Sequence, residues 1–312
     1  MGVRAQIVLF APDETRAVAA AQAAFQRLED LDQTLSDYRP SSELMRLCDS
    51  PPGTPIPISP DLAEVLETAV QIARCTDGAY DPTVGPLVAL WRRSRSSLAL
   101  PSEAERAEAR LFVGWHKLVL NGQARSATLS RSGMRLDLGG IGKGFAAHKA
   151  QTFLRELGYP MSLVALAGDI RAGDPPPERG GWRVAIPEPE GDSARDGGIS
   201  LLLSNQSIST SGASAQHVDI GGVRYAHVVD SRTGLGATRL NQATVVSFDG
   251  AIADALSTAS AILDPGRALA ICGMFPGTQT FIVESGERPI RHSSPGWALL
   301  LAPKNDTNPD PP

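Results

Sequence analysis

From residue 137 to residue 144 the sequence reads Asp-Leu-Gly-Gly-Ile-Gly-Lys-Gly. A strand-like run ends just before it at Leu136, and a helical pattern follows it over 144–158. The turn therefore places bare backbone, with Lys143, at the N-terminus of a helix. Exposed amides and the helix dipole favour an anionic group there. The residues alone leave two interpretations open: a structural strand-to-helix turn, or one wall of an anion-binding pocket.

The run does not match either of the common nucleotide-binding templates. A P-loop needs a glycine six residues before its lysine and a Ser or Thr after it, but Asp137 and Gly144 stand at those places. A dinucleotide fingerprint needs unevenly spaced glycines, whereas Gly140, Gly142 and Gly144 are evenly spaced. Neither template therefore explains the three glycines.

On both sides of the run, helical and strand-like patterns predict an α+β fold with a mostly antiparallel sheet flanked by helices. Expected helices cover 13–38, 60–78, 102–110, 144–158 and 250–263. Expected strands cover 3–9, 117–120, 126–130, 162–167, 182–186, 199–203, 225–229, 242–248, 278–284 and 298–302. We expect one domain over 1–302, an exposed hairpin loop over 187–198 and a disordered tail over 303–312.

The bulk properties exclude several classes of protein. The 312 residues carry a net charge of −5, which gives no reason to expect nucleic acid or an anionic membrane as partner. Cys48, Cys75 and Cys272 are widely spaced and predict buried free thiols, not a disulfide framework. The chain has no apolar stretch long enough for a membrane span and no signal-peptide core. We therefore expect a cytoplasmic protein, with an exported form open if residues precede this chain.

Asp254, Ser257 and Thr258 form a candidate metal site. On the helix expected over 250–263, Asp254 and Thr258 are four residues apart and share a face, with Ser257 beside them. A carboxylate with hydroxyls is a hard oxygen site that suits Mg²⁺. The residues alone also allow Asp254 to cap the helix and Thr258 to pack internally.

His227 is the candidate acid–base residue. It stands among apolar neighbours in the strand expected over 225–229, and a turn follows it. Imidazole takes up a proton near pH 7, but a single strand histidine is also common in protein cores. Two further segments, 81–87 and 168–171, read as turns when each is taken alone.

Together and in this order, the segments resemble the motif series of the ApbE family, the FAD:protein FMN transferases. The matching segments are Met1-Gly2, Leu35 to Ser42, Asp81 to Trp91, Asp137 to Gly144, Ala167 to Arg171, Thr210 to Gly212, His227 to Gly234 and Ala253 to Ala259. The resemblance implies a single ApbE-like domain related to the T-fold. It also implies an enzyme that splits FAD and attaches FMN to a Thr or Ser of an acceptor flavoprotein, releasing AMP.

The resemblance also assigns residues to the site. It implies a flavin-nucleotide pocket formed by Met1, Tyr38, Ala79, Tyr80, Asp81, Asp137, Lys143 and Val229. It implies a Mg²⁺ site formed by Asp254, Thr258, the main-chain carbonyl of Gly140 and, where some members have a second Asp, Ser257. His227 matches the family's histidine beside the scissile phosphate.

Three positions depart from the family pattern. Ala167 stands where Gly is usual, Ala213 where an acidic residue is frequent, and Ser231 where Pro is common. We expect Ala167 only to restrict the backbone conformations at that position. We expect Ala213 and Ser231, in loops near the site, to affect substrate preference. Two other functions use the same residues: a Mg²⁺-dependent FAD pyrophosphatase, in which water replaces the acceptor hydroxyl, and a non-catalytic flavin-binding protein.

Overall fold

The computed structural model describes residues 2–187, 198–212, 217–239, 241–284 and 289–303. The α-helices are α1 (Glu14–Leu35), α2 (Glu43–Cys48), α3 (Pro60–Cys75), α4 (Gly85–Ser97), α5 (Glu103–Arg110), α6 (Gly142–Glu156), α7 (Gly250–Ile262) and α8 (Pro265–Cys272). The strands are β1 (Ala5–Leu9), β2 (Ile56–Pro57), β3 (Leu118–Asn121), β4 (Ser126–Leu129), β5 (Ser162–Leu166), β6 (Asp169–Ala172), β7 (Trp182–Ala185), β8 (Ser200–Leu203), β9 (Ser207–Ser211), β10 (His217–Ile220), β11 (Val223–Ala226), β12 (Val229–Asp230), β13 (Leu235–Gly236), β14 (Gln242–Ser247), β15 (Gln279–Glu284) and β16 (Ile290–Ser293).

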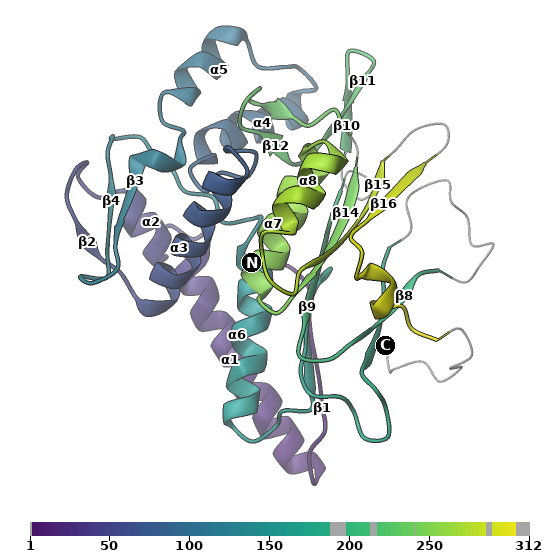
Figure 1. The fold of residues 1–312 in the computed structure, drawn as a ribbon. Coiled ribbons are helices and arrows are strands. Elements are labelled where there is room, and N and C mark those ends of the chain that lie inside the picture. Colours follow the sequence, from purple (N-terminus) through teal and green to yellow (C-terminus); the bar gives the residue numbers. More distant parts are fainter. Residues whose placement is uncertain (1, 188–197, 213–216, 240, 285–288, 304–312) are drawn as a thin grey trace.

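The centre of the fold is a seven-stranded sheet in the order β1-β5-β6-β9-β14-β15-β16, with every neighbouring pair antiparallel. Helices α6 and α7 pack against each other and on one face of this sheet, and α1 and α3 cover them from outside (Figure 1). These helices and the sheet enclose the main hydrophobic core. The predicted α+β class with an antiparallel sheet is confirmed.

The opposite face of the sheet has a second core. The two-stranded sheet β7–β8 and the 3₁₀ turn Trp297–Leu300 cover it. Trp182 and Trp297 are both buried there, and the Trp297 ring stacks on Phe281 with 5.2 Å between centroids. The middle of the sheet is therefore covered on both faces, and β14 is buried along its whole length.

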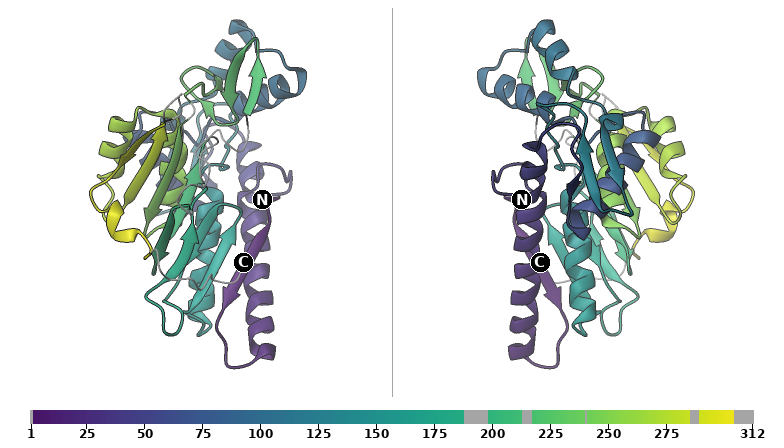
Figure 2. Two further views of the ribbon diagram at one scale, coloured as in Figure 1. Left: turned by 90° about the vertical axis from the view of Figure 1, so that its right-hand side faces the viewer. Right: turned by 90° about the vertical axis from the view of Figure 1, so that its left-hand side faces the viewer.

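A smaller lobe stands at one end of the sheet and is built from α4, α5 and the hairpin β10–β11 (Figure 2). Its core includes Leu87, Trp91 and Tyr225, and the Trp91 indole donates a hydrogen bond to the Ala226 carbonyl at 3.1 Å. Arg106 of α5 donates to the Thr233 carbonyl at 3.1 Å. These contacts fix the segment that runs from β11 through β12 and contains His227.

Most predicted elements are confirmed, but three are wrong. The strand-like run that ends at Leu136 is irregular backbone in the structure, held by contacts such as the hydrogen bond from the Leu136 amide to Cys48 Sγ at 3.3 Å. Over 298–302 the chain forms the 3₁₀ turn, and only Leu301 pairs, in an isolated bridge to Leu201. The strand expected over 225–229 breaks at His227, because the chain changes partner there: Ala226 pairs with β10, whereas Val229 pairs with Gly236 of β13. His227 thus lies in a bend and not in a strand.

The sequence patterns did not predict α2, α4 and α8. Helix α4 begins at Gly85-Pro86, two residues that interrupt helices but suit a first turn.

The segment 188–197 and the tail 304–312 lie outside the described residues. Cys48 and Cys272 are buried and Cys75 is half-buried, all as free thiols. Among the described helices, none combines the length and apolarity needed to cross a membrane.

His148 of α6 contacts the first residue of α7. Its Nδ1 accepts a hydrogen bond from the Gly250 amide at 3.1 Å, which requires a ring that is unprotonated at this atom. Burial, followed by the charge of Arg171, lowers the pKa of His148 to about 4, with Lys149 also lowering it and Asp249 opposing. The neutral ring is therefore part of the folded structure.

This histidine predicts a loss of stability in acid. Its folded pKa of about 4 lies below the unfolded value of about 6.5. Between these values the unfolded chain binds more protons, so stability falls as the pH falls. Because the side chain is 26% exposed, we expect this residue to account for a loss of about 1–2 kcal/mol between pH 7 and pH 4. Urea unfolding should show a shallower pH dependence in His148→Asn, which keeps an acceptor but cannot titrate. Equal slopes in both proteins would contradict the assignment.

Candidate active site

The glycine-rich run lies where α6 crosses α7. A Cβ on Gly144 would meet the Gly250 carbonyl oxygen at 2.1 Å, and one on Gly140 would meet the Thr258 side chain at 2.9 Å. A Cβ on Gly142 would meet only the Leu138 Cβ, at 3.9 Å. Two of the three evenly spaced glycines therefore face α7, and their spacing of four matches the spacing of Asp254 and Thr258.

Asp254 is buried at this crossing. Its Oδ2 accepts a hydrogen bond from the Gly144 amide at 2.9 Å, in the first turn of α6. Burial and the negative charge of Asp169 raise the pKa of Asp254, while Lys143 and the Gly144 amide lower it. Asp254 is not the N-cap of α7, because Asp249 occupies that position.

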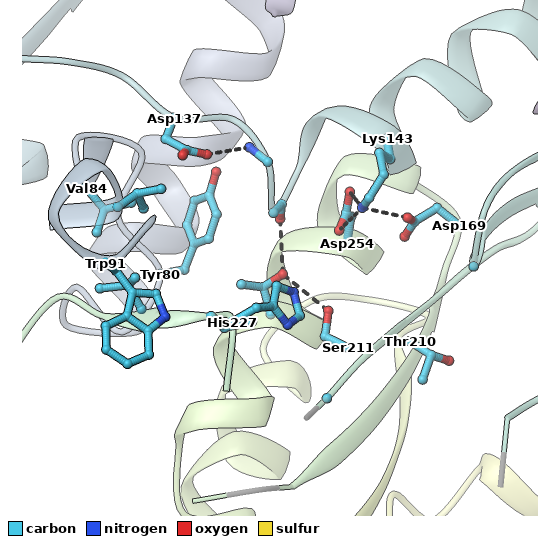
Figure 3. Close-up of a pocket in the computed structure, with 18 of the residues that line it drawn as sticks. Tyr80, Val84, Trp91, Asp137, Lys143, Asp169, Thr210, Ser211, His227 and Asp254 are labelled. Atoms are coloured by element: carbon cyan, nitrogen blue, oxygen red, sulfur yellow. Dashed lines mark hydrogen bonds and ion pairs between the residues drawn. The ribbon is translucent and has the colours of Figure 1, made fainter. Parts of the chain in front are cut away.

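Lys143 lies between two buried carboxylates (Figure 3). Its Nζ is 2.6 Å from Asp169 Oδ2 and 3.4 Å from Asp254 Oδ2. Burial lowers the pKa of Lys143, but the charges of Asp254 and Asp169 outweigh it and raise the pKa above its usual range. Ser209 donates a further hydrogen bond to Asp169. This arrangement keeps a charged ammonium group at the wall of the site.

A row of hydroxyls continues from α7 to β9. Thr258 Oγ1 lies 3.4 Å from the Gly140 carbonyl oxygen and 3.3 Å from Ser211 Oγ. Ser211 Oγ is also 3.0 Å from Ser257 Oγ. Ser257 donates to the Asp254 carbonyl at 2.9 Å and is fully buried. Ser257 therefore supports the site from behind, and its role as a metal ligand stays a prediction.

These groups face one cavity of about 450 Å³ between the main body and the small lobe. The cavity is lined by the predicted residues Tyr38, Ala79, Tyr80, Asp81, Asp137, Gly140, Lys143, His227, Val229, Asp254 and Thr258. Met1 lies outside the described residues. The predicted residues of five separate sequence segments therefore meet at one place, and His227 comes to it from the small lobe.

Asp81 lines the cavity but mainly holds its own turn together. Its carboxylate accepts from the Thr83 amide at 2.8 Å, the Thr83 hydroxyl at 2.6 Å and the Trp115 amide at 3.0 Å. Burial raises its pKa, and these hydrogen bonds oppose the shift. The Asp-Pro-Thr run is therefore a fixed turn that positions Ala79 and Tyr80.

No role is predicted from the sequence for Asp169, Ser211 or Arg92, although all three line the cavity. Asp169 follows the apolar strand β5 after a two-residue turn, and an acid in that position was the available signal. The partner of Asp169, Lys143, is far away in the sequence. Only the fold brings the two together.

Ala167 has a left-handed backbone, with φ of +53°. It stands in the turn between β5 and β6, lines the cavity, and donates its amide to the Arg4 carbonyl at 3.0 Å. Left-handed backbone disfavours residues that have a Cβ. The departure from the family's Gly is therefore a source of backbone strain, which the sequence expectation underestimated.

The chain is similar to known proteins over most of its length. The model of the ApbE family matches residues 1–282. A protein of Haemophilus influenzae named FAD:protein FMN transferase is 32% identical over 250 residues, covering 78% of this chain and 72% of that protein. A protein of the same name from Escherichia coli K12 is 30% identical over 263 residues, covering 82% and 74%.

The fold is also shared with a solved structure. The flavin transferase ApbE from Vibrio cholerae matches with a TM-score of 0.85 over 96% of both chains at 24% identity. This confirms the fold that the motif series implied.

The crossing of α6 and α7 predicts opposite outcomes for two glycines of the run. Gly144→Ala places a methyl group 2.1 Å from the Gly250 carbonyl oxygen, and we expect it to cost more than about 3 kcal/mol of stability. Gly142→Ala has open space and is the matched control, with an expected change of at most about 1 kcal/mol in either direction. Thermal unfolding of both variants measures the difference. A Gly144→Ala protein as stable as Gly142→Ala would disprove the close approach.

The backbone of Ala167 predicts a stabilising substitution. Ala167→Gly removes the left-handed strain but gives the unfolded chain more freedom, so we expect a net gain of about 0.5–1 kcal/mol in urea unfolding. Ala185→Gly, at an exposed position in β7, is the control and should lower stability by about 0.5–1 kcal/mol. A loss of stability in Ala167→Gly would argue against the left-handed conformation.

Proposed function

The chain belongs to the ApbE family, and we propose that it transfers FMN from FAD to a Thr or Ser hydroxyl of an acceptor flavoprotein with the help of Mg²⁺. The proposal rests on one observation above all: the oxygen groups of α7, the ammonium of Lys143 and the imidazole of His227 line one cavity. The relatives' name supplies the reaction class.

The donor set fits Mg²⁺. Asp254 Oδ1, Thr258 Oγ1 and the Gly140 carbonyl are hard oxygen donors, and Oδ2 of Asp254 is already held by Gly144. Within the described residues no three His, Cys, Asp or Glu side chains gather into a metal site, so the set depends on hydroxyl and carbonyl oxygens. Bound Mg²⁺ supplies Lewis-acid neutralisation of charge on the diphosphate of FAD.

The protein groups account for the remaining requirements of the reaction. The acceptor hydroxyl oxygen forms a bond to the FMN phosphorus, and the bond from that phosphorus to the AMP oxygen breaks. His227 takes the proton that the hydroxyl loses. Lys143, held by Asp169, offers positive charge to the oxygens that gain charge. Covalent FMN and AMP are the products.

The same geometry serves a FAD pyrophosphatase if water takes the place of the acceptor hydroxyl. We favour the transferase because the relatives above are named for transfer to protein. The two functions differ only in whether an acceptor hydroxyl or a water molecule attacks the FMN phosphorus.

The proposal predicts the products of a single incubation. Purified protein with FAD, Mg²⁺ and a candidate acceptor subunit should give an acceptor whose mass increases by one FMN on a Thr or Ser peptide, with an equal amount of AMP. FMN and AMP without labelled acceptor would identify a pyrophosphatase. If FAD stays intact for hours, the chain is a non-catalytic flavin-binding protein.

Two substitutions should separate the proposed roles from folding. Asp254→Asn keeps an acceptor for the Gly144 amide, and His227→Ala removes the proposed base. We expect each to lower the rate by at least about 100-fold. His148→Asn lies outside the cavity and is the control, with full activity expected at neutral pH. Full activity in Asp254→Asn would contradict the assignment of Asp254 as a Mg²⁺ ligand. Full activity in His227→Ala would contradict the assignment of His227 as the base.

A further inference from the structure

Arg92 of α4 stacks on Tyr38 at the mouth of the cavity. The guanidinium carbon is 4.5 Å from the centroid of the Tyr38 ring. Tyr38 itself is 71% exposed, so most of the residue remains accessible beside Arg92. Both residues line the cavity. An exposed ring that is held from one side is a ready surface for a planar ligand.

Arg92 also joins two carboxylates from different walls. It is 2.9 Å from Asp37 Oδ2, next to Tyr38, and 3.5 Å from Asp137 Oδ2, at the start of the glycine-rich run. Asp137 in turn accepts from the Gly139 amide at 2.8 Å. One guanidinium on α4 therefore contacts two other segments that are far apart in sequence.

The two carboxylates need this cation. Burial and the charge of Asp37 raise the pKa of Asp137, and Arg92 opposes that shift. Without Arg92, two like charges would face each other beside a cavity proposed to take a diphosphate. The loop that carries Asp37 and Tyr38 would then lose its attachment to α4.

We infer that Arg92 is a positioning residue that holds the Tyr38 ring for the flavin of FAD and thereby sets the affinity for FAD. This rests on the proposed function. Arg92 acts through Tyr38 because its planar group stacks on the ring while its Nη2 atom pairs with Asp37 and Asp137. A lysine has one point charge and cannot do both.

Arg92 has a competing role, since it lines the cavity and could pair directly with the FAD diphosphate. The two roles differ in their dependence on Tyr38. If Arg92 acts through the Tyr38 ring, replacing Arg92 should change FAD affinity little once Tyr38 is removed. If Arg92 pairs directly with the diphosphate, replacing it should weaken FAD binding with or without Tyr38. A double-mutant cycle of Arg92→Gln and Tyr38→Ala separates them.

The test is FAD binding to the full chain, measured by equilibrium dialysis without Mg²⁺ so that no turnover occurs, together with the absorption difference spectrum of the bound flavin. We expect Arg92→Gln to weaken binding about three- to tenfold and to reduce the difference spectrum. Arg92→Lys should recover little of the loss. In the Tyr38→Ala background, Arg92→Gln should change the affinity by less than about twofold.

Arg93→Gln is the matched control. It removes the same charge from the next residue of α4, is 71% exposed at the side chain, and does not line the cavity. Its affinity for FAD should equal that of the unchanged chain, and circular dichroism should show that all variants are folded.

The outcomes separate the inference from the proposed function. If the unchanged chain binds FAD and Arg92→Gln binds it equally well, the inference is wrong. An Arg92→Gln effect of the same size with and without Tyr38 overturns it in favour of phosphate pairing. Absence of FAD binding by the unchanged chain overturns the proposed function and the inference together.

Discussion

The contact that the rest of the site depends on is the approach of two backbones, where Gly144 of α6 meets Gly250 of α7. With no side chain between them, the first turn of α6 comes close enough for the Gly144 amide to bind the Asp254 carboxylate at 2.9 Å. The same crossing brings the Gly140 carbonyl to Thr258. The packing of two helices on one face of a sheet therefore also sets the distances between the proposed metal-binding oxygens.

The charges at the crossing of α6 and α7 compensate one another. Lys143 is shared between Asp169 and Asp254, and both carboxylates are buried. Burying a carboxylate costs several kcal/mol unless a charge and hydrogen bonds compensate it. Gly144 and Ser209 supply those hydrogen bonds. Asp254 can thus stay in the interior, and it is Asp169 that keeps Lys143 in place beside it.

The sequence predicted the fold class and the segments that form the site better than it predicted the contacts between them. Periodicity found α1, α3 and α6, because their apolar stripes are regular, whereas α7 is indicated by its run of small residues. It failed for α4, whose start is marked by Gly and Pro, and for His227, whose strand changes partner. Local pattern marks Asp169 only as an acid after a strand and does not mark Arg92, since their roles depend on Lys143 and Tyr38, which lie far away in the chain. The resemblance located the pocket, but only the fold explains why Gly140 and Gly144 must lack side chains.

The order of the central sheet has a consequence for how the protein forms during synthesis. Strand β1 is made first, but its partner is β5, with Ala5 opposite Leu166 and Leu9 opposite Ser162. Strand β1 therefore leaves the ribosome long before β5 does, and α1 is the element that follows it directly. Such long-range pairing slows folding and leaves a strand edge open. Half of the chain must be present before the first strand finds its place, and α7, which completes the crossing, comes later still.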